Sequence, residues 1–239
     1  MKTDLLDIRN CDCMDLMAEY EDWHFDLAIV DPPYGIGASR PSRKPNNVKQ
    51  RSGKKLSVKT NYYQHKDWDD NPANSEYFYQ LQRVSKNQII WGVNYFSYNL
   101  IGGRIVWDKL NGEKDQFDCE IAFNSLNNRT DIVRFMWSGM IQGINASRLV
   151  SKANTQQGNK KNNERRIHPT QKPVALYKWL LRNYAKEGDK ILDTHMGSGS
   201  IAIACHYMGF NLTACELDPD YYKAACERID RETRQISLF

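Results

Sequence analysis

The chain has 239 residues, of which 41% are hydrophobic and 26% are charged, and its formal net charge is +4. This composition is ordinary for a soluble globular protein and leaves enough apolar residues for a sizeable core. No apolar run approaches the roughly 18–20 residues that span a bilayer, and the amino-terminal segment has acidic residues where a secretory signal would be apolar. These features argue against a membrane-spanning or secreted protein, and we expect a cytoplasmic one.

The six cysteines show no C-x-x-C pair, and four of them lie in apolar segments that resemble core. We therefore expect reduced, mostly structural thiols rather than a zinc site or disulfides, and no metal site. The cysteines are Cys11, Cys13, Cys119, Cys205, Cys215 and Cys226.

The first third of the chain predicts two strands. A short strand ends near Cys11, and Asp12 opens a helix after it. A second strand runs from Phe25 to Val30 and stops at "DPPYG", because proline has no N–H with which to continue a ladder. Open α/β folds place their ligands at the carboxyl ends of strands, so the corner that holds Asp31 and Tyr34 is a candidate site, with a plain turn as the alternative.

The stretch 37–66 contains nine basic residues and no acidic one. Such a stretch cannot bury a core, so we expect a flexible insert. It could be a merely solvated loop, but its position directly after the candidate site favours contact with a polyanion. The residues assigned to that contact are Arg43, Lys44, Arg51, Lys54 and Lys55.

The rest of the chain predicts a regular α/β pattern. Three β-rich runs are separated by Gly, Asn and Asp turns, and the carboxyl-terminal third alternates helices with short buried strands. The β-rich runs are 87–96, 103–109 and 119–125, the helices are 172–185, 200–209 and one that begins at Pro219, and the strands are 189–193 and the run "NLTACELD".

The turn "DTHMGSGS" (193–200) has the plan of a nucleoside site. Gly197 and Gly199 allow the backbone to approach a ligand at a helix amino terminus, and Glu216 follows at the end of the next strand, where it can accept both ribose hydroxyls. The dinucleotide glycine spacing and the G-K-[ST] motif are both missing, so a nucleoside without phosphates, such as S-adenosylmethionine, fits better. A simple strand-to-helix turn is the alternative.

DPPY (31–34), HPTQKP (168–173) and DTHMGSGS (193–200), in this order, resemble the motifs of the β-type amino-group DNA methyltransferases. The resemblance covers most of the chain and implies one circularly permuted domain over residues 1–239, with a doubly wound, mostly parallel, seven-stranded sheet. It also implies that the chain ends lie close together, that the cofactor is S-adenosylmethionine, and that the source is bacterial or phage. The implied cofactor residues are Asp12, Asp31, Thr170, Lys172, Asp193, Gly197, Gly199 and Glu216. Asp12 can reach the cofactor's adenine amine, or simply cap its helix.

The catalytic residues that the resemblance implies are Asp31, Pro32, Pro33 and Tyr34. Asp31 and the Pro32 carbonyl would accept the two N–H bonds of an exocyclic amine in double-stranded DNA, and Tyr34 would stack on an extruded base. Asp rather than Ser at the first motif position favours adenine N6 over cytosine N4. Cytosine N4 methylation and a non-catalytic DNA-binding protein of the same fold remain the alternatives.

Two further segments carry expectations about partners. Residues 124–166 occupy the target-recognition position of the resembled family, with Arg134, Arg148, Arg165 and Arg166 as donors to bases and phosphates. The segment Gln235–Phe239 resembles the pentapeptide that docks on the replication sliding clamp, with local packing of its apolar residues as the alternative. No nuclease motif is evident, so a restriction partner would be a separate chain.

Overall fold

The computed structural model describes residues 1–39, 48–49, 55–56, 66–110, 117–138, 141–143 and 163–234. Its centre is an eight-stranded sheet. In this sheet β1, β12, β11, β2 and β5 are neighbours in that order and run parallel, and β7 runs antiparallel to both of its neighbours. In sheet order, the strands are β1 (Leu6–Arg9), β12 (Asn211–Cys215), β11 (Lys190–Asp193), β2 (Phe25–Val30), β5 (Ser85–Trp91), β7 (Cys119–Asn124), β6 (Gly103–Asp108) and β8 (Thr130–Arg134).

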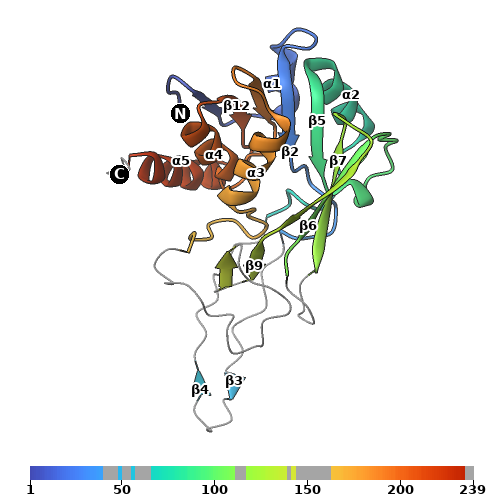
Figure 1. Cartoon of the computed structure of the whole chain (residues 1–239). Coiled ribbons are helices and arrows are strands. Elements are labelled where there is room, and N and C mark those ends of the chain that lie inside the picture. The colour runs from blue at the N-terminus through green and yellow to red at the C-terminus, as the bar shows by residue number, and fades with distance from the viewer. Residues whose placement is uncertain are drawn as a thin grey trace.

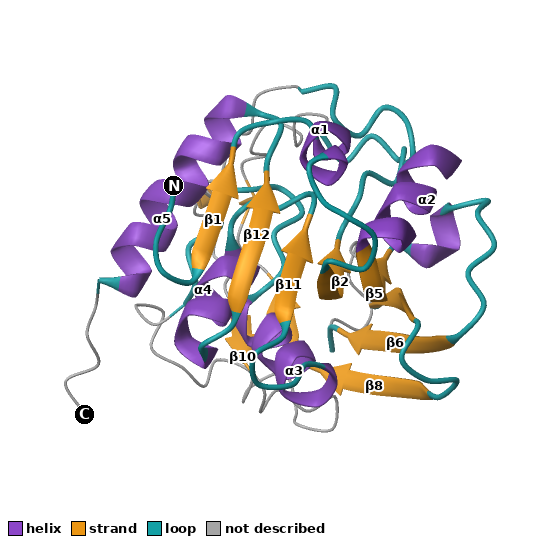
Figure 2. Cartoon of the chain, turned by 90° about the horizontal axis from the view of Figure 1, so that it is seen from above, coloured by secondary structure: helices purple, strands orange, loops and turns teal. Residues whose placement is uncertain are grey.

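Helices cover both faces of this sheet (Figure 2). One face carries α1 (Cys13–Ala18) and α2 (Ser75–Val84). The other carries α3 (Val174–Tyr184), α4 (Ser200–Met208) and α5 (Pro219–Thr233). The remaining elements are the short 3-10 helix η1 (Val93–Tyr95) and two small hairpins, β3 (Val48–Lys49) with β4 (Lys55–Leu56) and β9 (Met136–Ser138) with β10 (Ile141–Gly143).

Strand β2 is apolar on both faces because successive side chains point to opposite faces and both faces are buried. Leu27 and Ile29 belong to the core beneath α3, α4 and α5, whereas Ala28 and Val30 belong to the core beneath α1 and α2. A strand that is buried on both faces reads as a continuous apolar run, as parallel strands in α/β proteins do. The strand predicted from Phe25 to Val30 is therefore confirmed in type and bounds.

The permuted order of the chain is visible in the pairing of β1. This strand pairs in parallel with β12, and the Met1 ammonium donates to Tyr222 Oη in α5 at 2.7 Å. The beginning of the chain thus completes the sheet beside the last βα unit (Figure 1). The amino terminus and α5, the last described helix, thus lie on the same side of the molecule.

The structure differs from the expected sheet at its far edge. The sheet has eight strands rather than seven, because Thr130–Arg134 pairs in parallel with β6. This strand lies inside the segment 124–166, which we expected to recognise the DNA target, and Asn124 itself ends β7 with no exposed surface. Val133 is buried by the sheet, so part of the expected recognition segment belongs to the scaffold.

Helix α2 was not among the predicted elements, although its sequence carries the signals of a helix. Asn74 caps it by accepting the Tyr77 N–H at 2.9 Å, and its buried residues recur at helical spacing. They are Tyr77, Phe78, Leu81 and Val84. Among the described residues, no helix combines the length and the apolar character that crossing a membrane requires.

Candidate active site

Two cavities open at the carboxyl edge of the parallel strands and meet at Asp31. The larger, of about 480 Å³, is lined by the DPPY corner, by β7 and by the segment before α3. The smaller, of about 200 Å³, is lined by the turn after β11 and by the loops after β1 and β12. Both are also lined by Pro33, Trp68, Thr170, Gln171 and Lys172. This common wall allows a ligand in one cavity to reach a ligand in the other.

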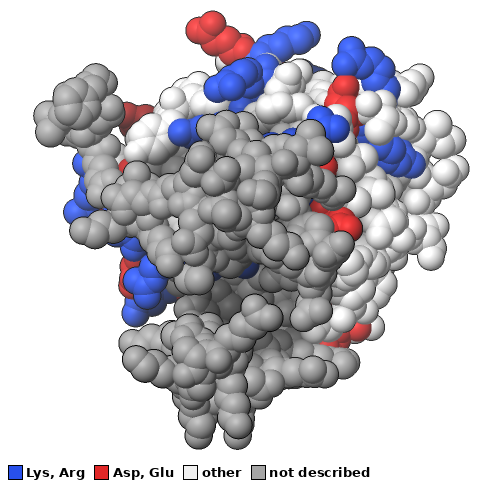
Figure 3. Space-filling model, turned by 60° about the horizontal axis from the view of Figure 1, so that its bottom comes forward, with Lys and Arg blue, Asp and Glu red and all other residues white. Residues whose placement is uncertain are grey.

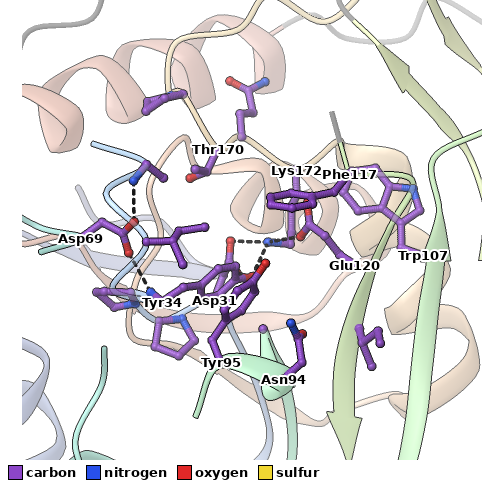
Figure 4. Close-up of a pocket in the computed structure, with 18 of the residues that line it drawn as sticks. Asp31, Tyr34, Asp69, Asn94, Tyr95, Trp107, Phe117, Glu120, Thr170 and Lys172 are labelled. Carbon is purple, nitrogen blue, oxygen red and sulfur yellow. Dashed lines mark hydrogen bonds and ion pairs between the residues drawn. The ribbon is translucent and has the colours of Figure 1, made fainter. Parts of the chain in front are cut away.

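Asp31, at the end of β2, has both carboxylate oxygens occupied by neighbouring side chains (Figure 4). Its Oδ1 accepts the Tyr34 hydroxyl at 2.5 Å, and its Oδ2 forms an ion pair with Lys172. Lys172 also pairs with Glu120 of β7 at 3.0 Å, and Glu120 pairs with Lys109 at 2.5 Å. These four charged groups form one chain of alternating sign, which we call the charge chain: Asp31, Lys172, Glu120 and Lys109.

Burial and pairing act against each other along the charge chain. Burial raises the pKa of Asp31, and Lys172 opposes that shift. Burial also acts to raise the pKa of Glu120, but its pairs with Lys172 and Lys109 outweigh burial and hold it below the ordinary value. Burial acts to lower the pKa of Lys172, but the two carboxylates raise it above the ordinary value. The ammonium of Lys172 therefore stays charged at neutral pH.

The DPPY corner is held in place by a carboxylate that lies far from it in sequence. Asp69 is 1% exposed, and its two oxygens accept the backbone N–H groups of Tyr34 at 2.7 Å, Gly35 at 2.9 Å and Ala38 at 2.7 Å. These three bonds fix the path of the chain directly after the prolines. Asp69 thus positions the corner through its backbone.

The two prolines of the corner differ in their carbonyl groups. The Pro33 carbonyl accepts the Ala73 N–H at 3.1 Å. The Pro32 carbonyl accepts no hydrogen bond from the described residues. An acceptor therefore remains open beside Asp31.

The Tyr34 ring is tightly packed. It stacks on Tyr95 with ring centroids 5.0 Å apart and an interplanar angle of 13°. A Cβ at Gly92, where φ is +73°, would come within 2.1 Å of the ring, so only glycine fits there. Other aromatic side chains line the larger cavity, so a planar ligand would meet ring faces there; they are Trp68, Trp107, Phe117 and Trp137.

The glycine turn after β11 lines the smaller cavity through only one of its two glycines. Gly197, at φ +54°, lines it, and a Cβ there would have no atom closer than 3.8 Å. Gly199 does not line it, and a Cβ there would lie 2.8 Å from Ile229 of α5. Gly199 therefore permits helix packing, and Gly197 is the glycine that leaves room for a ligand.

A buried ion pair supports the same turn from behind. Arg228 of α5 is 2% exposed and donates to the Ser198 carbonyl at 2.9 Å and to Ser200 Oγ at 2.9 Å. Its other nitrogen pairs with Glu164 at 2.9 Å, and Glu164 also accepts the Val174 N–H at the start of α3. The turn is thereby tied to the segment that leads into HPTQKP.

The predicted acidic residues of the smaller cavity lie at neighbouring strand ends. Glu216, after β12, accepts the N–H groups of Gly197 and Asp218, each at 2.9 Å, and burial raises its pKa. Asp12, after β1, caps α1 by accepting the Met14 N–H at 2.7 Å through Oδ1. Both line the cavity, so two carboxylates face the same space.

Three other residues that we predicted to bind the cofactor, Asp193, Thr170 and Lys172, differ from one another in their position relative to the smaller cavity. Asp193 is 1% exposed, lines neither cavity and accepts the His195 N–H at 3.0 Å, so it lies behind the turn. Burial raises its pKa to about 8. Thr170 lines both cavities and lies 3.1 Å from His168 Nδ1, and Lys172 belongs to the charge chain.

Three of the predicted DNA-contacting arginines can be placed. Arg134 is exposed and lies 3.6 Å from Asp108, and Arg165 is exposed. Arg166 lines the larger cavity and lies over the Trp137 ring at 4.7 Å. The side chains of Arg43, Lys44, Arg51, Lys54, Lys55 and Arg148 and the segment Gln235–Phe239 lie outside the described residues. On the face that carries the carboxyl edge, the described Lys and Arg side chains lie among Asp and Glu (Figure 3).

Sequence reasoning missed four side chains of the site: Lys109, Glu120, Asp69 and His195. Glu120 lies on β7 and Lys109 directly follows β6. The sequence predicts only β-rich runs there, because the roles of both residues depend on which strands become neighbours. Asp69 follows the basic insert, in a segment without a periodic pattern. His195 lies inside the turn motif DTHMGSGS, between Thr194 and the glycines, so its place in that motif was the one signal that could have identified it.

Comparison with known proteins gives a consistent result. The sequence model for N6/N4 methyltransferases, described as DNA methylase, matches residues 90–227, more than half of the chain. The chain is 37% identical over 71 residues to the type II methyltransferase M.HpaI of Haemophilus parainfluenzae and 35% identical over 65 residues to M2.DpnII of Streptococcus pneumoniae. These segments are 30% and 27% of this chain and 23% and 24% of those relatives. The match thus covers about a quarter of the length of each curated relative.

Similar solved structures span nearly the whole chain. The M1.HpyAVI–SAM complex has a TM-score of 0.53 at 19% identity and covers 94% of this chain and 100% of its own. The PvuII DNA methyltransferase, which is cytosine-N4-specific, has a TM-score of 0.55 at 12% identity and covers 98% of this chain and 93% of its own. At these identities the likeness concerns the fold, and it confirms the predicted α/β methyltransferase architecture.

Proposed function

The chain belongs to the N6/N4 DNA methylase family, and we propose that it transfers a methyl group from S-adenosylmethionine to the N6 amine of adenine in double-stranded DNA. The observation that carries this proposal is Asp31, which lies where the two cavities meet, next to the open carbonyl of Pro32. The larger cavity would hold the target base, and the smaller one the cofactor.

The smaller cavity fits S-adenosylmethionine in its charge and in its backbone. The cofactor is a nucleoside that carries a positive sulfonium and no phosphate, and the cavity presents the carboxylates of Asp12 and Glu216 beside the space at Gly197. Burial lowers the pKa of His168 to about 3 and that of His195 to about 4, so both imidazoles are neutral at pH 7. A cation therefore meets acceptors and neutral rings there, without a repelling imidazolium.

Asp31 and Pro32 supply what an exocyclic amine needs. The amine is a poor nucleophile, because its lone pair is delocalised into the ring. Two acceptors that hold its two N–H bonds orient the lone pair away from the ring plane, and such positioning contributes several kcal/mol in favourable cases. Bound S-adenosylmethionine supplies an electrophilic methyl group. Lys172 favours the ionised form of Asp31, and in that form the carboxylate can accept an N–H bond and take up the proton that the methylated amine releases.

The larger cavity suits a base that has left the duplex. Its volume of about 480 Å³ and its aromatic walls can accommodate a planar ring. A base that is still stacked inside the duplex could not reach this cavity. Tyr34 and Tyr95 together offer a stacked aromatic surface beside Asp31. We assign Arg134, Arg165 and Arg166 to contacts with the surrounding DNA, together with the basic residues outside the described part of the chain.

The choice of adenine rests on the first motif residue, Asp31, since Asp at that position favours adenine N6 in the resembled family. The fold does not discriminate, because a cytosine-N4-specific enzyme has a similar one. Cytosine N4 methylation is the second candidate, as its amine presents the same two N–H bonds to Asp31 and Pro32.

The test is to incubate the full chain with duplex DNA and labelled S-adenosylmethionine, and to analyse the digested nucleosides by mass spectrometry. We expect N6-methyladenine. N4-methylcytosine would establish the second candidate, and cofactor and DNA binding without any methylated base would indicate a non-catalytic DNA-binding protein.

Asp31→Ala is the control within that assay. It should abolish transfer, because it removes an acceptor of the substrate amine. Cofactor binding should change little, because the smaller cavity keeps Glu216, Asp12 and Gly197. Full activity of this variant would refute the proposed chemistry.

A further inference from the structure

His195 belongs to a hydrogen-bonded row that the catalytic assignment leaves unused. The Tyr77 hydroxyl, buried in α2, lies 2.7 Å from Thr194 Oγ1, and Thr194 Oγ1 lies 2.9 Å from His195 Nδ1. The His195 ring packs edge-on against the Tyr77 ring, with centroids 5.2 Å apart. One end of the imidazole is therefore fixed inside the protein.

The hydrogens of this row fit in only one arrangement. If Tyr77 donates to Thr194 and Thr194 donates to Nδ1, each hydroxyl hydrogen has an acceptor. If Nδ1 carried the hydrogen instead, one hydroxyl hydrogen would lack an acceptor among the described residues, and a buried unpaired donor costs free energy. The network therefore assigns the hydrogen to Nε2.

The Nε2–H group faces the smaller cavity. His195 lines that cavity, and no described residue forms a hydrogen bond with its Nε2. Asp12 lines the same cavity, and its Oδ2 likewise has no hydrogen-bond partner among the described residues, since only Oδ1 caps α1. One open donor and one open acceptor thus share one space.

The strand order indicates which part of the cofactor lies between them. Along the sheet, Asp31 follows β2, His195 follows β11, Glu216 follows β12 and Asp12 follows β1. If the methyl group is near Asp31 and the ribose is at Glu216, the purine continues toward Asp12. His195 follows the strand between Asp31 and Glu216, but its ring packs against Tyr77, in the same core as Cys13 and Met14 of α1. His195 is therefore held on the side of the sheet that carries Asp12. An adenine edge carries N–H donors on its exocyclic amine and acceptors at its ring nitrogens.

We propose that His195 Nε2–H donates a hydrogen bond to a ring nitrogen of the cofactor's adenine, whose amine meets the open Oδ2 of Asp12 as the family resemblance implies. This assignment rests on the proposed function, because it assumes that S-adenosylmethionine occupies the smaller cavity. His195 and Asp12 then select adenine by a matched donor and acceptor, and Tyr77 and Thr194 position the donor.

The experiment measures binding rather than turnover. The full chain is titrated in a calorimeter with S-adenosylhomocysteine and with its 1-deaza, 3-deaza and 7-deaza purine analogues, each of which replaces one ring nitrogen by C–H. One of the three analogues should bind about 3- to 10-fold more weakly than S-adenosylhomocysteine, the loss expected for one hydrogen bond. This arm needs no variant, so it does not depend on the folding of a mutant.

Two variants then assign the loss to His195. His195→Phe keeps a planar ring without a donor and should weaken binding of S-adenosylhomocysteine about 3- to 10-fold, while removing the penalty of the sensitive analogue. His195→Gln can place an N–H near the Nε2 position and should recover part of the affinity. Thermal denaturation without ligand is the control for folding.

Equal affinity of all four ligands for the wild-type chain would overturn the inference, as would an analogue penalty of the same size in the wild type and in His195→Phe. These results leave the proposed function intact, because S-adenosylhomocysteine still binds. Absence of any binding of S-adenosylhomocysteine to the wild type would instead remove the proposed cofactor, and this inference with it.

Discussion

The cavity that we assign to the target base and the one that we assign to the cofactor differ in how their titratable groups are paired. In the larger cavity, ion pairs link Asp31, Lys172, Glu120 and Lys109 in alternating sign. Beyond the wall that the two cavities share, the smaller cavity has neutral imidazoles, and its carboxylates, Asp12 and Glu216, accept backbone N–H groups rather than pair with cations. The base side balances its charges internally, whereas the cofactor side leaves negative charge available.

This difference follows from what each side has to accept. A neutral base needs acceptors of fixed position, and an ion-paired carboxylate is fixed by its partners. A cationic cofactor needs acceptors that no internal cation occupies. Asp12 and Glu216 meet that need, whereas Lys172 in the shared wall is already paired with Asp31 and Glu120. Three changes test this difference: removing Lys172 from the ion pairs on the base side, removing the Asp69 carboxylate that anchors the DPPY corner, and replacing Asp193 behind the glycine turn.

Lys172→Met should have the largest effect, because it leaves Asp31 and Glu120 as two buried carboxylates without their shared cation. Removing one partner of a buried ion pair costs about 3–5 kcal/mol, and we expect the free energy of unfolding to fall by about that amount, with methyl transfer reduced about 100-fold or more. Urea denaturation and single-turnover transfer measure the two effects.

The double variant Lys172→Met with Glu120→Gln is the matched control. It removes one of the two carboxylates, so part of the lost stability should return. If the single and double variants are equally stable, the repulsion between Asp31 and Glu120 is not the cause, and the charge chain has a different role.

Asp69→Ala should affect the base side alone. It removes the acceptor of three backbone N–H groups in the DPPY corner, so we expect a loss on the order of 3 kcal/mol in stability and a lower rate of transfer. Binding of S-adenosylhomocysteine, measured by calorimetry, should be unchanged, because Asp69 does not line the smaller cavity.

The neighbouring exposed residue provides the comparison for Asp69. Asp70→Ala removes a carboxylate of the same segment that makes no bond to the corner, and it should leave stability and transfer unchanged. Equal losses in the two variants would show that the segment as a whole, and not the Asp69 carboxylate, holds the corner.

Asp193→Asn should have the smallest effect on methyl transfer, and the size of its effect on stability should depend on pH. The folded-state pKa of Asp193 is raised by burial from 3.8 to about 8, so between about pH 4 and pH 8 the folded chain holds a proton that the unfolded chain has released. Stability should therefore fall as pH rises through that window. The Asn variant has no such proton and should be more stable than the wild type at pH 9 by several kcal/mol, because each unit of pKa difference contributes about 1.4 kcal/mol, with a smaller difference at pH 5.

Thermal denaturation of the ligand-free chain from pH 5 to pH 9 measures this difference. Asn keeps an oxygen that can accept the His195 N–H, so the turn should retain its shape. A difference that is constant with pH would mean that Asp193 titrates in the folded chain as it does in the unfolded one.

Particular elements show how far the sequence could be interpreted. The strand at Phe25–Val30 and the helix that Gly209 ends were predictable, because their apolar periods and their terminating residues are local. Helix α2 carried the same kind of signal and was missed. Strand β8 was not predictable from its five residues, because an edge strand is defined by the neighbour to which it pairs.

The sequence by itself determined the order of the motifs, the glycine turn and the placement of Asp31, Asp12 and Glu216 after strands, because each depends on contiguous residues whose backbone and burial preferences act locally. Only the tertiary structure decided that Lys172 meets Asp31 across 141 positions, that Glu120 joins them and that Asp69 anchors the corner. Those contacts depend on which strands become neighbours, and that is decided by packing of the whole sheet between its two layers of helices.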